Sequence, residues 1–261
     1  MENSGVISME ASVSGRDDCY YRIQAGAGIK YIIVKAGALD AGAVMDMPLD
    51  FENILLSIPY HDAGWNKAIV FRDTKTHALQ RTLSQDDPPT LQSIWHPDMI
   101  SFFDIEKKTQ LSVLTQECLW IHSEILVSTQ SKNPNPQMAI AKVARFPWEI
   151  RYIEAETKIY QLLQDSNIAP RFLGHIQEGG RVIGFLLEKV VGCPAGSDDL
   201  EACQTVLHRL HGLGILHGDT NRYNFIIDSE VKATIIDFES ACPNADACRM
   251  VQEVNTSAAA E

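Results

Sequence analysis

The chain has 261 residues, of which 45% are hydrophobic and 21% are charged, and this profile is that of an ordinary globular protein with one large or two small domains. The formal net charge of −12 leaves no overall basic surface to follow a phosphate backbone, so we expect no nucleic-acid partner. No apolar run is long enough to span a membrane, and residues 1–18 are polar and acidic where a signal peptide is basic and then apolar, so we expect no membrane partner and a cytoplasmic location.

The N-terminal third of the chain predicts a small β-rich unit. Residues 1–16 are expected to be disordered, and the unit is expected to cover 17–97. Within it, the strand-like runs CYYRIQ and KYIIVKA flank Ala-Gly-Ala-Gly, and the runs KAIVFRD and HALQRTL flank Thr-Lys-Thr. Each pair has the alternation and the turn residues of a β-hairpin, so we predict two hairpins.

The middle of the chain mixes strands with one helix. ISFFDIEKK (100–108) and the apolar stretch 111–127 read as strands, and MAIAKVA (138–144) reads as a buried strand that carries one lysine. A helix is predicted next, with Pro147 near its start and Ile153, Tyr160 and Leu163 at helical spacing. A strand hairpin is expected to follow it, made by RFLGHI and RVIGFLLEKVV around Glu-Gly-Gly.

A second helix is predicted in SDDLEACQTVLHRLHGLG. Asp198 is its expected N-cap, with Glu201 three residues later. The helix is expected to pack on a core through one face, formed by Leu200, Cys203, Leu207 and Leu210. A strand pair is predicted around DSEVKATIID, and the tail after it has room for one short helix.

The stretch HGDTNRYNF carries the polar residues that most strongly indicate chemistry. His217, Asp219 and Asn224 form the pattern H-x-D-x-x-x-x-N, and Asp237 follows thirteen residues after Asn224, at the end of an apolar run. Phosphoryl transfer needs a carboxylate that takes the proton of the attacking hydroxyl, and it needs oxygen ligands for the metal that bridges the phosphates. We therefore predict Asp219 as the base and Asn224 with Asp237 as ligands of Mg²⁺.

The other parts of a phosphotransferase occur in the expected order. Lys142 lies in the predicted buried strand, where a lysine holds the α- and β-phosphates of ATP, and Glu156 lies in the helix that follows, where a glutamate orients that lysine. Glu149 and Glu154 remain alternatives to Glu156. The stretch FLLEKV then lies where the chain links two lobes, and its backbone groups are expected to bind adenine. This predicts a nucleotide contact at Leu187, Glu188 and Val190.

On these motifs, residues from about 100 to 240 resemble the protein-kinase-like fold, in the HGD-bearing branch of aminoglycoside and choline kinases. AKVARFPWE, APRFLGH, RVIGFLLEK and LHGLGILHGDTNRYNF are similar to a family of small fungal kinase-like proteins often catalogued under an α-galactosidase label. That label finds no support, because one catalytic-loop pattern after a β-rich start does not indicate a β/α barrel. The resemblance implies an α+β, two-lobe fold divided into a kinase-like N-lobe and hinge at 98–192 and a truncated C-lobe with the catalytic loop at 193–261.

The chain departs from the kinase pattern at three places. The stretch EKKTQLSVLTQE, where kinases place a glycine-rich loop over the phosphates, contains no glycine. Asp237 is followed by Phe and Glu instead of Phe and Gly, which resembles choline kinases. Only 24 residues follow Asp237, so we expect the part of the C-lobe that normally anchors the catalytic loop to be missing. Gly218, where many protein kinases have arginine, argues against control by an activation-loop phosphate.

Two functions remain open at this point. The first is an ATP- and Mg²⁺-dependent phosphotransferase acting on a small-molecule or atypical protein hydroxyl, or a kinase fold that transfers another activated group. The second is a pseudokinase that serves as a nucleotide-binding or interaction module, and a purely structural role for Asp219 and Asn224 as turn caps is the simplest alternative. A truncated lobe would expose the face of the 199–213 helix, so we expect the 17–97 unit or the second subunit of a homodimer to cover it.

Overall fold

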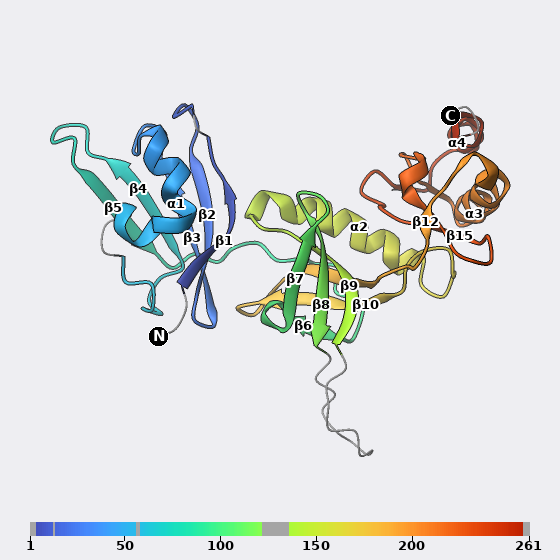
Figure 1. The fold of residues 1–261 in the computed structure, drawn as a ribbon, viewed down its shortest axis with the longest axis horizontal. Helices are drawn as coiled ribbons and strands as arrows, with labels where there is room; N and C mark the ends of the chain where they lie inside the picture. Colours follow the sequence, from blue (N-terminus) through green and yellow to red (C-terminus); the bar gives the residue numbers. More distant parts are fainter. Residues whose placement is uncertain (1–3, 13, 56–57, 122–135, 258–261) are drawn as a thin grey trace, which may run out of the picture. The chain divides into compact units, whose positions relative to one another are not determined.

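The computed structural model describes residues 4–12, 14–55, 58–121 and 136–257, and it has a mixed α+β fold (Figure 1). Two compact units make up the chain. Unit 1 contains residues 1–89 with two short segments, 145–147 and 178–180, and unit 2 contains the remainder. Within the described ranges, we find no helix with both the length and the apolar character that crossing a membrane requires.

Unit 1 is built on a five-stranded sheet with the strand order β1-β2-β3-β4-β5. The β2–β3 and β4–β5 pairs are antiparallel, so both hairpins predicted from the sequence are confirmed. Gly26 lies between β2 and β3 with φ +59°, a conformation that glycine adopts without steric cost. The strands are β1 (Ser4–Glu10), β2 (Cys19–Ala25), β3 (Gly28–Val34), β4 (Lys67–Arg72) and β5 (Leu79–Ser84).

The expectation of a disordered N-terminus over 1–16 is wrong for Ser4–Glu10. These residues form the edge strand β1, which pairs antiparallel with β2 and places Val6 opposite Ile23. An edge strand is held by backbone hydrogen bonds along one side only, so it needs little apolar alternation of its own. Its sequence, SGVISME, therefore lacks the strict alternation that marks a strand.

Helix α1 (Ala41–Ile54) was not predicted from the sequence. It connects β3 to β4, which run parallel and therefore need a crossover between them. The side chain of Asp40 caps the helix by accepting a hydrogen bond from the amide of Ala43 at 2.8 Å. Val44, Met47 and Phe51 are its buried residues, but Pro48 interrupts the pattern that would have revealed it.

Unit 2 begins with a six-stranded sheet in the order β6-β10-β11-β9-β8-β7. Lys142 lies on β9 near the middle of this sheet, opposite Thr115 of β8 and Phe185 of β11. The strand predicted over 111–127 is present as β8, while residues 122–127 fall outside the described ranges. The strands are β6 (Met99–Ser101), β7 (Ile105–Gln110), β8 (Thr115–Ile121), β9 (Pro136–Val143), β10 (Phe172–Glu178) and β11 (Arg181–Glu188).

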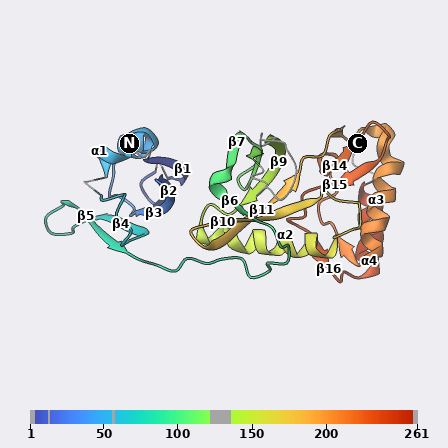
Figure 2. The ribbon, with the colours of Figure 1, turned by 90° about the horizontal axis from the view of Figure 1, so that it is seen from below.

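Helix α2 (Ile150–Leu162) lies against this sheet, as Figures 1 and 2 show, and confirms the first helix predicted in this part of the chain. Its buried residues recur at helical spacing and include Ile153, Glu156 and Tyr160. A buried glutamate on the apolar face of a helix needs a charged or hydrogen-bonding partner. The same face therefore both packs on the core and carries a candidate site residue.

Helices α3 (Leu200–Gly212) and α4 (Ala247–Ser257) lie side by side in the rest of unit 2 (Figures 1 and 2). The N-cap position of α3 is Asp199 and not Asp198, because residues 197–199 form a short 3-10 turn in front of the helix. Small sheets accompany these helices: β12 (Cys193–Pro194) with β14 (Phe225–Ile227) and β15 (Ala233–Ile235), and β13 (Ile215–Leu216) with β16 (Cys242–Pro243).

The buried face of α3 consists of Cys203, Val206, Leu207 and Leu210, whereas Leu200 is 38% exposed. This face packs against β15, and α4 lies beside the helix within the same unit. The helix is thus covered by its own chain, which removes the reason for expecting a second subunit at this face. A homodimer remains a prediction, but an exposed face of α3 no longer supports it.

Candidate functional site

The buried ammonium of Lys142 is the centre of the candidate site. Its Nζ lies 2.7 and 2.9 Å from the two carboxylate oxygens of Glu156 on α2, and 2.6 Å from Oδ1 of Asp237. The side chains of Lys142 and Glu156 are 7% and 3% exposed, while that of Asp237 is 45% exposed. The structure therefore brings together three predicted site residues from a strand, a helix and a loop.

The charges in this group depend on one another. Burial opposes the charge on Lys142, but the carboxylates of Glu156 and Asp237 outweigh it and raise the pKa of Lys142 above its ordinary value. Burial also raises the pKa of Glu156, a rise that Lys142 and the amide of Phe238 oppose. Lys142 is thus held as a cation, and that cation offsets part of the cost of burying the charge of Glu156.

The structure decides between the glutamates that the sequence left open. Glu154 accepts hydrogen bonds from Ser93 and Gln92 at 2.6 and 2.8 Å and lies 3.0 Å from Lys158. Glu156 is the one that contacts Lys142. Glu154 and Glu156 are two residues apart on α2, and side chains at that spacing point to different sides of a helix. The spacing from Lys142 alone could not show which of the two faces that lysine.

The backbone around Asp237 is locked by its neighbours. Asp237 has φ +63°, an uncommon conformation for a residue with a side chain. The amide of Phe238 donates to Oε1 of Glu156 at 3.1 Å, and the buried ring of Phe238 packs edge-on against Tyr160. These two contacts of the residue that follows Asp237 help to hold its side chain toward Lys142 despite the unfavourable backbone angle.

The predicted base, Asp219, is exposed and held by two amides. Asn221 donates to its Oδ1 at 2.9 Å, and Asn224 donates to its Oδ2 at 3.2 Å and to its backbone carbonyl at 2.9 Å. Asn221 also caps the short 3-10 turn that contains Asn224 by accepting from the amide of Tyr223. Both asparagines therefore fix the direction in which the carboxylate of Asp219 points.

Two hydrogen bonds tie this loop to the segment that carries Asp237. The amide of Ile236 donates to the carbonyl of Asn224 at 2.9 Å, and Nε2 of the buried His217 lies 3.0 Å from the carbonyl of Ile236. Because a carbonyl only accepts, the proton of a neutral His217 belongs on Nε2. Its Nδ1 then accepts from the amide of Asp219 at 3.3 Å.

Gly218 is required at its position in the loop. It has φ +83°, and a Cβ atom there would lie 2.4 Å from the carbonyl oxygen of Ser240. A larger residue would need the backbone of the loop or of residue 240 to move. The glycine is therefore explained by the turn itself.

The sequence missed Glu253, a residue of α4 that anchors the loop carrying Asp219. Its carboxylate is 8% exposed and accepts hydrogen bonds from the amides of His217 and Gly218 at 3.1 and 2.5 Å, and it lies 2.6 Å from Nε2 of His211. The short helix after Asp237 thus supplies an anchor for this loop from within the same unit. The only sequence signal was an acidic residue in the short helix predicted for the tail.

Two oxygens of the site retain free lone pairs. Oδ2 of Asp237 and the side-chain oxygen of Asn224 accept no hydrogen bond from any described residue, since Asp237 uses Oδ1 and Asn224 uses its amino group. Carboxylate and amide oxygens are the ligands that Mg²⁺ prefers, and it commonly takes only one or two from the protein. The donor set fits magnesium, although the described residues contain no cluster of three or more His, Cys, Asp or Glu side chains suited to a metal.

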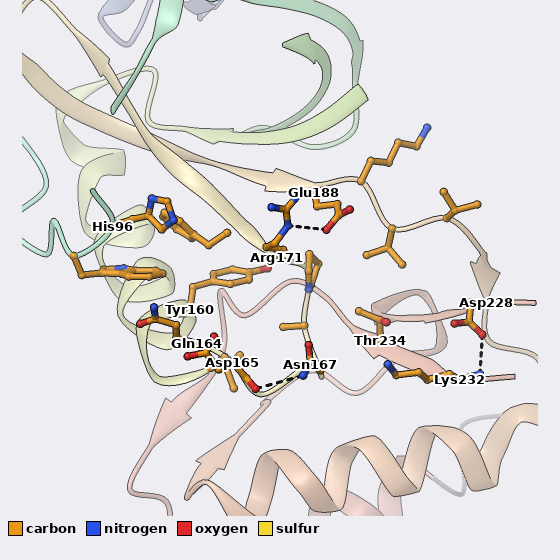
Figure 3. A pocket seen from close by; sticks show the side chains of 18 residues that line it. His96, Tyr160, Gln164, Asp165, Asn167, Arg171, Glu188, Asp228, Lys232 and Thr234 are labelled. Carbon is orange, nitrogen blue, oxygen red and sulfur yellow. Dashed lines mark hydrogen bonds and ion pairs between the residues drawn. The ribbon is translucent and has the colours of Figure 1, made fainter. Parts of the chain in front are cut away.

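The predicted adenine-binding residues lie elsewhere. Leu187 is buried on β11 opposite Ile140, and the amide of Glu188 already donates to the carbonyl of Arg171 at 2.9 Å. Glu188 and Val190 line a cavity of about 680 Å³ (Figure 3). Lys142, Glu156, Asp219, Asn224 and Asp237 are not among the residues that line it. The cavity is thus distinct from the group around Lys142.

A scan against protein-family models found no family that matches this chain, and a search of curated proteins found no match either.

Proposed function

We propose that the chain is an ATP- and Mg²⁺-dependent phosphotransferase with a protein-kinase-like two-lobe fold in unit 2, acting on the hydroxyl of a small molecule or an atypical protein substrate. The contact of Lys142 with both Glu156 and Asp237 carries this proposal. A buried lysine on a central strand, paired with a helix glutamate and close to an exposed carboxylate, is the arrangement that phosphoryl transfer uses. Similarity to the small fungal kinase-like proteins is part of the same proposal.

Lys142 would bind the phosphates, Glu156 would hold Lys142 in place, and Asp237 would help to hold the metal. Glu156 is buried and fixed on α2, so it holds the ammonium of Lys142 in place for the α- and β-phosphates. Asp237 and Asn224 would hold Mg²⁺ through their free oxygens. Bound there, the metal would neutralise charge on the phosphate oxygens.

Asp219 would position the attacking hydroxyl and take its proton. Its exposure leaves it open to a substrate, and the amides of Asn221 and Asn224 fix its orientation before a substrate binds. Such preorganisation lowers the cost of reaching a reactive geometry. The backbone of Val190 remains the proposed contact for adenine from the linking segment, because the amide of Glu188 is already used.

Thermal unfolding with and without ATP and Mg²⁺, on wild type and Asp237→Asn, tests the proposal. Ligand at 100 times Kd stabilises the folded state by about 2.7 kcal/mol. We expect the wild type to show a magnesium-dependent shift that Asp237→Asn reduces strongly. A wild type with no shift would refute nucleotide binding, and a shift that survives Asp237→Asn unchanged would refute the metal assignment.

A pseudokinase that binds nucleotide without transferring phosphate is the second candidate. Two observations favour it: the β7–β8 hairpin contains no glycine, and Lys142 already occupies one oxygen of Asp237. Measuring ATP turnover separates the two candidates, because Asp219→Ala should abolish turnover in an active enzyme while leaving ATP binding nearly intact. Wild type that binds ATP without any turnover would favour the pseudokinase.

A further inference from the structure

The cavity of about 680 Å³ lies entirely within unit 2, and its volume is in the range of small-molecule sites. Its walls come from the end of α2, the loop that leads into β10, the segment after β11 and the turn between β14 and β15. Figure 3 shows side chains from these segments around a common space. The phosphotransfer proposal uses no charged side chain of this cavity.

Among the three lysine and arginine side chains of the cavity, Lys232 is the one with spare binding capacity. Arg171 forms an ion pair with Glu188 at 3.2 Å, and Lys189 forms one with Glu117. The ammonium of Lys232 has no hydrogen-bond or ion-pair partner among the described residues, and the protein as a whole carries a formal charge of −12. An unpaired cation on the wall of a cavity is suited to an anionic group of a ligand.

The acidic residue that this turn contributes to the cavity, Asp228, already accepts hydrogen bonds from the backbone. Oδ1 of Asp228 accepts hydrogen bonds from the backbone amides of Glu230 and Lys232 at 2.9 and 3.0 Å. The cavity has one more acidic side chain without an ion-pair partner among the described residues, that of Asp165. In Figure 3 it lies beside Gln164 at the left, whereas Lys232 lies at the right. Neither carboxylate is therefore expected to compete with a ligand for the ammonium of Lys232.

A second donor accompanies Lys232. Thr234 follows two residues later, on β15, and its side chain also lines the cavity. Its hydroxyl has no hydrogen-bond partner in the described part of the chain. Together the two side chains offer an ammonium and a hydroxyl, which match the two oxygens of one carboxylate.

Apolar residues also line the cavity. Val190 and Val191 line the cavity from the segment after β11, and Val191 is 84% exposed. Ala169 and Pro170 line it from the loop before β10. A valine so exposed at the rim of a cavity would be shielded from water by a flat apolar ligand, with a gain of about 25 cal/mol for each Å² covered.

We propose that this cavity binds a small carboxylic acid with an apolar, ring-containing body. Lys232 and Thr234 hold the carboxylate, and the body covers Val191. None of these three residues belongs to the group around Lys142 or to the proposed contact for adenine, so the site does not depend on phosphotransfer. It assigns a ligand class to side chains that the phosphotransfer proposal leaves without a role.

Calorimetric titration at low ionic strength tests this with three probes that share one ring system: 2-naphthoate, 2-naphthamide and 2-naphthylmethylamine. We expect the full-length wild type to bind the acid about tenfold more tightly than the amide and the amine most weakly, as one charge-assisted contact predicts. Lys232→Gln should weaken binding of the acid about tenfold and leave the amide unchanged. Val191→Ser should weaken all three probes by a similar factor.

Lys107→Gln is the matched control, because Lys107 is an exposed lysine of β7 outside the cavity. It should leave all three affinities as in wild type, and so should Asp237→Asn, which alters the phosphotransfer site alone. Three outcomes overturn the proposal: no binding of 2-naphthoate at millimolar concentration, equal affinity for the acid and the amide, or equal effects of Lys232→Gln and Lys107→Gln. Circular dichroism of each variant checks that the fold is retained.

Discussion

The group around Lys142 and the loop around Asp219 are held together in opposite ways. Lys142, Glu156 and Asp237 come from distant elements, and their contacts are between charges that are mostly buried. Asp219 is exposed, and its side-chain partners Asn221 and Asn224 lie within five residues of it. Removing one member of a buried ion pair is strongly destabilising because the other charge stays buried without compensation, whereas losing a local bond in water costs little. The first group should thus be needed for folding and the second mainly for chemistry.

Glu156→Ala tests the buried half of this comparison and should have the largest effect. Without Glu156, Lys142 keeps its charge at 6% exposure with only the half-exposed Asp237 as a partner. We expect the free energy of unfolding to fall by about 3–5 kcal/mol, as for other buried ion pairs that lose one member. Urea-induced unfolding measures it.

Glu201→Ala serves as the control for this loss, because Glu201 is an exposed glutamate in the first turn of α3. Its effect should stay within about 0.5 kcal/mol, as for most surface substitutions. If the two variants are equally stable, the Lys142–Glu156 contact adds nothing to folding and the comparison fails.

Lys142→Met sharpens the comparison through its dependence on pH. Burial already raises the pKa of Glu156, and removing Lys142 takes away the cation that opposes this rise. In the variant, the unfolded state releases the proton of Glu156 at a lower pH than the folded state does, so the free energy of unfolding falls as pH rises above about 4.5. Relative to wild type, the variant should thus be less destabilised at pH 5 than at pH 8.

Using the difference between the two proteins at each pH removes the contribution of groups that titrate alike in both. The double variant Lys142→Met/Glu156→Gln has no carboxyl at this place, so its difference from wild type should change much less with pH. A stability difference between wild type and Lys142→Met that is the same at pH 5 and pH 8 would show that Glu156 is not the group in question.

Glu253→Gln tests the one buried charge that supports the exposed loop. A glutamine presents an amino group where the amides of His217 and Gly218 need an acceptor. We expect a loss of about 1–2 kcal/mol, smaller than at Glu156 because no buried lysine is left unpaired. Hydrogen exchange at those two amides should become faster, whereas Glu230→Gln, in an exposed turn, should leave both unchanged.

The same contrast explains what the sequence could predict. Lys142 and Asp237 were found because each is a charged residue in or at the end of an apolar run, where a charge is costly unless it has a partner. Glu156 was found because it lies in the helix that follows Lys142. Asp219 and Asn224 were found by their spacing within one loop. Most helices and strands of the described residues were found by periodicity, which is local information.

The features that the sequence missed depend on neighbours in space. Glu253 reaches its partners from 36 residues away, and nothing in the local sequence of α4 marks it as buried. The cavity is formed by four separate segments, so no single motif describes it. Helix α1 was missed for a local reason, because Pro48 argues against a helix that the packing of Met47 and Phe51 stabilises.

Asp219→Ala should have the smallest effect on stability and the largest on chemistry. Asn221 can exchange its lost partner for water, and Asn224 keeps the backbone carbonyl of residue 219 at 2.9 Å, so the free energy of unfolding should change by less than about 1 kcal/mol. ATP turnover should nevertheless be lost, because no other group is placed to take the proton. A large loss of stability would mean that the loop is a structural turn, in which Asp219 and Asn224 act as caps.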